Sequence, residues 1–89
     1  EAHSLGFATR VCADPYTEAI AFAREIAGKS PDAIRAAKRL LRLAETADPA
    51  SILQAESTEQ VALLGSPNQV EAVSANLQNR APRFVDPVA

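Results

Sequence analysis

The stretch that decides the fold runs from residue 30 to residue 67 and reads SPDAIRAAKRLLRLAETADPASILQAESTEQVALLGSP. It contains three Ser-Pro or Asp-Pro pairs, and a fourth such pair, Asp14-Pro15, precedes it. An Asp or Ser side chain accepts hydrogen bonds from the free N–H groups of a helix's first turn. Proline suits the next position because it lacks an N–H that would need a partner there. The four pairs therefore predict four helix starts, at residues 15, 31, 49 and 67.

Apolar residues recur with helical spacing after each of these starts. We expect helices at about 15–27, 31–46, 49–64 and 67–79, with Gly28 and Gly65 ending the first and the third. Residues 66–69 add the S-x-x-Q pattern of a capping box. The expected inward stripes combine alanines with larger apolar residues: Tyr16, Ala19, Ile20, Ala23, Ile26 and Ala27; then Ile34, Ala37, Leu41 and Ala44; then Ile52, Leu53, Ala55, Leu63 and Leu64; then Val70, Val73 and Leu77.

Two segments outside these helices are expected to be extended. Residues 7–12 read as a short strand or an extended connector, because a lone strand cannot satisfy its own backbone and needs a partner from elsewhere. The proline-containing tail should be held by Phe84, and Cys12 is expected to be a small buried residue. The predicted fold is all-α with about four amphipathic helices, divided into residues 1–13 that join a missing core, a helical domain at 14–80 and an extended tail at 81–89.

The composition suggests a marginal domain. The chain has 89 residues, and 19 of them are alanine, so only about 23 hydrophobic residues are larger than alanine. Burial stabilises in proportion to the apolar area removed from water, and an alanine-rich core therefore contributes little. The chain also contains no methionine. We expect it to be a piece of a longer protein that shares its core with residues outside it.

Several functional classes are disfavoured. No apolar run approaches the roughly 18–20 residues of a membrane span, and no signal-peptide pattern opens the chain. The single cysteine, Cys12, and the single histidine, His3, leave no disulfide framework, metal cluster or Ser-His-Asp set. A net charge of −2 argues against a nucleic-acid surface. We expect a cytoplasmic protein with no metal site.

Two charged groups of residues require a decision between surface and site. The basic face of the second helix is interpreted as a solvated face compensated by neighbouring acids, with phosphate contact as the less favoured reading: Arg35, Lys38, Arg39 and Arg42. Glu56, Glu59 and Gln60 interrupt the third helix. Catalytic acids need a cleft and a shifted pKa, so these three are interpreted as exposed helix surface or a polar patch between helices.

Read in order, four phrases resemble the C-terminal region of the enoyl-CoA hydratase/isomerase (crotonase) family. Residues 1–7 (EAHSLGF) are similar to the family's E-A-x-x-L-G-L, and residues 30–38 (SPDAIRAAK) to its S-P-x-A-φ-x-x-x-K helix. The family's E-x-x-x-Q-x-x-x-L phrase and its E-G-φ…R-x-P-x-F ending correspond to Glu56, Gln60 and Leu64, and to Glu71, Ala72, Val73, Arg80, Pro82 and Phe84.

The resemblance implies a helical part of a crotonase-like α/β spiral fold that lies after the catalytic core. In that role residues 14–80 are expected to help form the oligomer and to close as a lid over a CoA site of their own or an adjacent subunit. In that family the upstream core supplies an oxyanion hole and acid–base glutamates for acyl-CoA lyase or isomerase chemistry in fatty acid metabolism. We therefore expect no catalytic residue in this chain and no activity from it alone. Its implied partners are its own missing core, neighbouring subunits of a trimer-based assembly, and acyl-CoA as substrate, with no covalently bound cofactor.

The same resemblance implies a contact with coenzyme A. Some relatives carry F-x-x-K-R in the last helix, where the aromatic ring and the lysine meet the adenine and the phosphate of CoA. Aligned on Arg80, these positions are Asn76 and Asn79 here. An asparagine neither stacks like an aromatic ring nor adds positive charge, so the CoA contact assigned to Asn76, Asn79 and Arg80 is expected to be weakened or shifted, with Arg83 as a further donor.

Two other functions remain open. Helix starts 16 and 18 residues apart resemble a helix-hairpin repeat of about 34 residues, which would make the chain a protein-interaction adaptor. Against this, the helices share no repeated signature residues. A small helical nucleic-acid module is the third possibility, and the acidic balance of the chain disfavours it.

Overall fold

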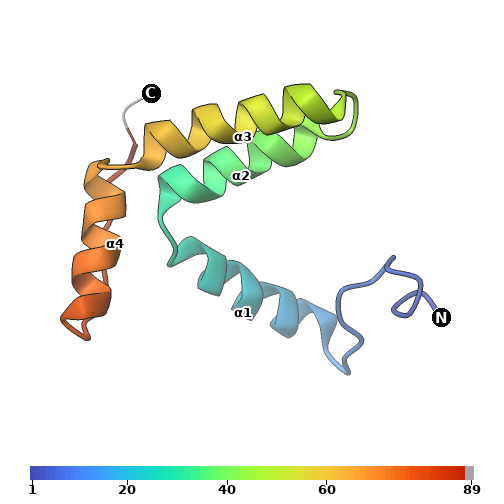
Figure 1. Ribbon diagram of the computed structural model, residues 1–89. Helices are drawn as coiled ribbons and strands as arrows, with labels where there is room; N and C mark the ends of the chain where they lie inside the picture. The colour runs from blue at the N-terminus through green and yellow to red at the C-terminus, as the bar shows by residue number, and fades with distance from the viewer. Residues whose placement is uncertain (88–89) are drawn as a thin grey trace.

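Four α-helices follow one another in the computed structural model, which describes residues 1–87 (Figure 1). They are α1 (Pro15–Ala27), α2 (Pro31–Leu43), α3 (Pro49–Leu63) and α4 (Pro67–Leu77). All four begin at the predicted proline, and residues 1–87 contain no strand. The all-α fold class is confirmed. The predicted ends at 46, 64 and 79 were one to three residues too late, since turns follow α2 and α4 and α3 stops at Leu63.

Three of the four predicted N-caps carry their hydrogen bond. Asp14 accepts from the Thr17 N–H (3.2 Å) at α1, Asp48 from the Ser51 N–H (2.7 Å) at α3 and Ser66 from the Gln69 N–H (3.4 Å) at α4. The Ser30 side chain makes no such bond. The capping box at α4 is displaced by one residue, because the Gln69 side chain accepts from the Gly65 N–H at 3.1 Å.

The N-terminal segment closes like the end of a helix and forms no strand. The Phe7 N–H donates to the Ala2 carbonyl (2.8 Å) and the Gly6 N–H to the His3 carbonyl (3.1 Å), with Gly6 at φ +85°. This is the Schellman pattern that terminates helices. Residues 7–12 then run as an irregular connector, because no second strand within residues 1–87 offers them a partner. Cys12 is exposed here, contrary to the expected burial.

The helices spread out around a single hairpin. Figure 1 shows α2 and α3 side by side and antiparallel, with α1 leading away from the start of α2 and α4 following the end of α3 at the same open end of the hairpin. The Cα radius of gyration is 16.2 Å, whereas a compact domain of 89 residues has about 12 Å. The accessible surface is 7295 Å², roughly 2,300 Å² more than a compact protein of this mass exposes.

The chain packs through its small and polar faces. Its buried hydrophobic residues are Ala36 on α2 and Ala75 on α4. The predicted inward stripe of α2 was wrong, because Leu41 is 71% exposed and Ile34 is 38% exposed. The stripe on α4 was wrong in the same way, and so was most of the stripe on α1; exposed members of these stripes include Tyr16, Ile26, Val70, Val73 and Leu77.

The physical reason is that α2 and α4 each carry two faces with helical spacing. On α2 the residues that line the groove facing α3 include Ala33, Ala36 and Leu40, one position before the predicted stripe. Small side chains let two helices approach closely, and the larger apolar side chains then point elsewhere. No helix within residues 1–87 combines the length and the apolar character that a membrane crossing requires.

Candidate functional site

A pocket of about 310 Å³ lies where the end of α1, the side of α4 and the C-terminal tail meet. The tail, residues 81–87, contains no helix or strand and is called the strap below; residues 88 and 89 of the predicted tail lie outside the described residues. The pocket contains two of the predicted CoA contacts, and its lining residues are Gly28, Lys29, Ser30, Ala72, Ala75, Asn76, Arg80, Pro82 and Phe84.

Arg80 is held by Glu71 across one side of this pocket. Its Nη1 donates to Glu71 Oε2 (2.6 Å) and its Nη2 to Glu71 Oε1 (3.0 Å), while Nε donates to the Gln78 side chain (2.9 Å). The hydrogen bonds from Arg80, followed by the one from the Arg83 N–H, lower the pKa of Glu71 to about 2. The same carboxylate raises the pKa of Arg80. The positive charge of Arg80 is therefore largely compensated within the chain.

Asn76 lines the pocket, whereas Asn79 does not. Asn79 has φ +52° and follows the last turn of α4. Its N–H donates to the Asn76 carbonyl (3.2 Å) and the Arg80 N–H to the Ala75 carbonyl (3.0 Å). These two bonds form a Schellman motif, in which the left-handed position usually belongs to glycine and sometimes to asparagine. Asn79 therefore has a structural role as the cap of α4, and its contact with CoA stays a prediction.

Lys29 is a pocket residue that the sequence analysis did not single out. It is exposed at the turn between α1 and α2, and among residues 1–87 its ammonium group has no ion-pair partner. A single exposed lysine after a glycine gives no signal of function in the sequence. Only the return of the strap along α4 brings Lys29 to the same hollow as Asn76 and Arg80.

Phe84 anchors the strap as expected. It is half-buried and lines the pocket together with Ala72 and Ala75. The backbone of the strap is also held, since the Arg83 N–H donates to Glu71 Oε2 at 2.8 Å. The strap therefore runs back along α4 and forms one wall of the pocket.

The acids of α3 form the polar patch between helices that was one of the two expected readings. Glu59 accepts from Arg39 Nε and Nη2, both at 2.7 Å, and this bidentate pair lowers the pKa of Glu59. Glu56 and Gln60 line the groove between α2 and α3. Arg39 is thus compensated by a neighbouring helix, as the interpretation of the basic face of α2 required.

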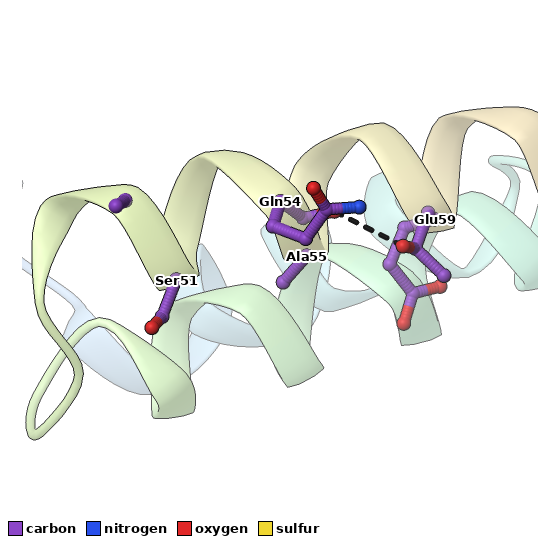
Figure 2. A pocket seen from close by; sticks show the side chains of 6 residues that line it. Ser51, Gln54, Ala55 and Glu59 are labelled. Carbon is purple, nitrogen blue, oxygen red and sulfur yellow. Dashed lines mark hydrogen bonds between the residues drawn. The ribbon is translucent and has the colours of Figure 1, made fainter.

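A second hollow of about 500 Å³ lies along α3 and brings together alanines and short polar side chains (Figure 2). Its polar members are Ser51, Gln54, Thr58 and Glu59. Thr58 donates to the Gln54 carbonyl of its own helix (3.0 Å), and Glu59 is paired with Arg39. Two of the four polar side chains that line this hollow, those of Thr58 and Glu59, are therefore already engaged within the chain. No cluster of three or more potential metal ligands occurs within residues 1–87.

Comparison with known proteins gives a match among solved structures. No protein-family model matches the chain, and no curated protein matches it in sequence. The crystal structure of an enoyl-CoA hydratase from Polaromonas sp. JS666 is similar to it, with a TM-score of 0.85 and 27% sequence identity. The match covers 94% of this chain and 34% of the hydratase chain, so this chain spans about a third of that protein's length. The open arrangement of helices described above is thus found inside a solved hydratase.

Proposed function

We propose that this chain is the C-terminal helical region of an enoyl-CoA hydratase/isomerase-like acyl-CoA enzyme and that it acts together with a catalytic core that it does not contain. The observation that carries the proposal is the structural match, which covers 94% of this chain at a TM-score of 0.85 but only 34% of the hydratase. A coincidental match between two helical domains is not expected to reproduce an open arrangement in which α2 and α3 pair and the other helices pack little.

The distribution of apolar surface supports the same proposal. The large apolar side chains of α1, α2 and α4 are exposed, while small residues fill the contacts within the chain. Contiguous exposed apolar surface marks a site of protein contact. In the proposed enzyme these faces pack on the catalytic core and on neighbouring subunits, and the region covers part of an acyl-CoA site.

Within that role, we assign the pocket beside the strap to coenzyme A. Its phosphates require positive charge, which Lys29 supplies without an internal partner, while Arg80 is already engaged by Glu71. Asn76 offers hydrogen bonds and the Phe84 ring offers an apolar face for the adenine. Lys29 thus compensates for the lysine that the family resemblance led us to seek at position 79.

The helical-repeat adaptor receives no support from the arrangement of the helices. Repeat proteins bury their cores by stacking one hairpin on the next. Here α2 and α3 form the extensive helix pairing, and α1 and α4 do not form a second hairpin stacked on it (Figure 1).

The decisive experiment is the longer gene sequence followed by kinetics of the protein that it encodes. The proposal requires a Gly-rich oxyanion-hole segment upstream of Glu1, and a gene without one would refute it.

In the encoded enzyme, Lys29→Gln should raise KM for acyl-CoA several-fold with kcat unchanged. Lys38→Gln, which removes an exposed charge of α2 that does not line the pocket, should leave KM unchanged. Deleting residues 80–89 should raise KM further or disrupt assembly; unchanged kinetics and assembly would contradict the lid role.

A further inference from the structure

The largest fully buried side chain within residues 1–87 is polar. Asn68 is 2% exposed, although it occupies the second position of α4, where a side chain is ordinarily solvated. Its Nδ2 donates to Asp32 Oδ2 (2.8 Å) and to the Val85 carbonyl (2.7 Å), and its Oδ1 accepts from the Val85 N–H (2.9 Å). A buried amide costs free energy unless its hydrogen bonds are made. Here both donors and the acceptor are used.

These three bonds join three segments that are far apart in the sequence. The Asn68 amide binds both polar backbone groups of Val85, as a neighbouring strand would, and so fixes the strap against the start of α4. Its remaining proton reaches Asp32 in the first turn of α2, 36 residues away. Asn68 therefore sets the position of the strap and of α2 relative to α4 at one point.

A second attachment lies one turn further along α4. Glu71 accepts the Arg83 N–H, while Asn68 holds Val85, so the strap runs antiparallel to the helix. Phe84 lies between the two attached residues and lines the pocket from the strap side. The wall that Phe84 and Pro82 contribute therefore depends on both attachments. The attachment of Val85 to the buried Asn68 is expected to be the stronger of the two. Glu71, which holds Arg83, also takes part in an exposed pair with Arg80, and water competes for such pairs.

We propose that Asn68 is a positioning residue that clasps the strap to α4 and to α2, and that the pocket shared by Lys29, Asn76 and Phe84 exists only while this clasp is closed. The proposal concerns the chain's own architecture and does not depend on acyl-CoA being the ligand. Opening the clasp frees residues 81–87 and removes one wall of the pocket. Closing it places Phe84 opposite the end of α1.

Asn68→Asp tests the clasp because two physical effects predict opposite results. A carboxylate in the first turn of α4 is favourable for the helix dipole, so an Asn68 that served only the helix would tolerate the change. In the clasp, the new oxygen replaces the donor that faces the Asp32 carboxylate and the Val85 carbonyl. Both bonds are then lost and two carboxylates confront each other. Gln54→Glu makes the same amide-to-carboxylate change at an exposed position of α3 that does not line the pocket and is the matched control.

The measurement is amide hydrogen exchange at Val85 in the 89-residue chain, with the amides of α3 as internal reference. Asn68→Asp should accelerate exchange at Val85 by roughly tenfold or more, the loss expected for a hydrogen bond to a buried group, while the α3 amides stay unchanged. Gln54→Glu should leave exchange at Val85 unchanged. Asn68→Ala should show the same local loss without the added charge. The clasp would be overturned if Val85 keeps its protection in Asn68→Asp and Asn68→Ala, or if α3 and Val85 lose protection equally in these two variants. It would also be overturned if the Val85 amide is unprotected in the parent chain.

A kinetic arm separates this proposal from the acyl-CoA assignment. In the longer enzyme, Asn68→Asp should raise KM for acyl-CoA with little change in kcat, because it displaces a pocket wall and no reacting group. Loss of Val85 protection with an unchanged KM would keep the clasp and refute the CoA pocket. An unchanged exchange rate would refute the clasp whatever the kinetics show.

Discussion

The C-terminal and N-terminal ends of the molecule differ in the contacts that hold them. The C-terminal unit, α4 with its strap, is closed by long-range polar contacts: Asn68 with Asp32 and Val85, and Glu71 with Arg80 and Arg83. The N-terminal unit, residues 1–27, has no buried residue, and its polar contacts are local. Arg10 meets Glu18 and the face of Phe22, and Asp14 meets Thr17. The C-terminal unit therefore makes its packing contacts within this chain, whereas the N-terminal unit leaves its side chains exposed.

The difference lies in what each helix offers at its inner face. α4 turns small and hydrogen-bonding residues toward its strap, so a short segment of the same chain suffices to cover them. α1 carries large side chains, of which Tyr16 is 77% exposed, and Phe7 before it is 85% exposed. Side chains of this size need a broad apolar partner surface, which residues 1–87 do not supply. The C-terminal unit should therefore be sensitive to substitution in this chain, and the N-terminal unit should not.

The largest effect is expected from enlarging a buried alanine of α4. Ala75 is 1% exposed beneath the strap, so Ala75→Leu should destabilise the chain by about 1–3 kcal/mol through overpacking. Ala23→Leu, at an exposed position of α1, is the matched control and should be nearly neutral. Urea unfolding followed by circular dichroism measures both. Equal losses of unfolding free energy in the two variants would show that the two units do not differ in their sensitivity to substitution.

The next effect concerns the left-handed cap of α4. Asn79 has φ +52°, a conformation that costs an alanine roughly 1–2 kcal/mol but that glycine adopts freely. Asn79→Ala should therefore lower the stability of the C-terminal unit by about 1 kcal/mol, whereas Asn79→Gly should preserve it. Thermal unfolding of the two variants checks the order. A chain in which alanine equals glycine at this position would not contain the Schellman cap.

A smaller effect, because the pair is exposed, is expected on acidification. The pKa of Glu71 is lowered from 4.5 to about 2, so its contribution to stability is fully present above pH 4.5 and is lost as the pH falls towards 2. The Arg83 amide resonance should titrate with a midpoint near 2. Glu71→Gln should remove this titration and reduce the loss of stability between pH 6 and pH 3. A midpoint close to 4.5 would show that the strap is open.

The smallest effect on stability is expected in the N-terminal unit. Tyr16→Ser removes a largely exposed ring of α1 and should change the free energy of unfolding by no more than about 0.5 kcal/mol. The same substitution should weaken self-association of the chain, which analytical ultracentrifugation would measure. Thr17→Ser, a small change beside it at an exposed position, should alter association less. A monomeric parent chain would contradict the docking role of these apolar faces.

The sequence predicted the elements better than their faces. The four proline pairs located every helix start, because capping chemistry is local and needs no knowledge of the remaining chain. The stripes were misjudged on α2, where Ala36 is buried and Leu41 is exposed. The spacing of apolar residues locates the apolar faces of a helix. In a helix with both an alanine face and a leucine face, it does not say which of the two is buried. The choice depends on which partner is present.

The candidate site shows the same division. The family phrases led to Arg80 and Asn76, and the structure brings both to one pocket. Lys29 and Asn68 had no signal of their own, since an exposed lysine after a glycine and an asparagine in a first helical turn are common. Their roles arise from the return of the strap along α4, a contact across many residues that no local pattern encodes.

The sequence by itself determined four helices that each begin at a proline, and too little large apolar surface for a complete core. These properties follow from backbone hydrogen bonding and composition, which act at short range. The tertiary structure alone decided that small faces pack inward, that Asn68 joins α2, α4 and the strap, and that Lys29 lines the same pocket as Arg80. These depend on which segments become neighbours, and that is fixed by the balance of close packing and buried hydrogen bonds over the whole chain.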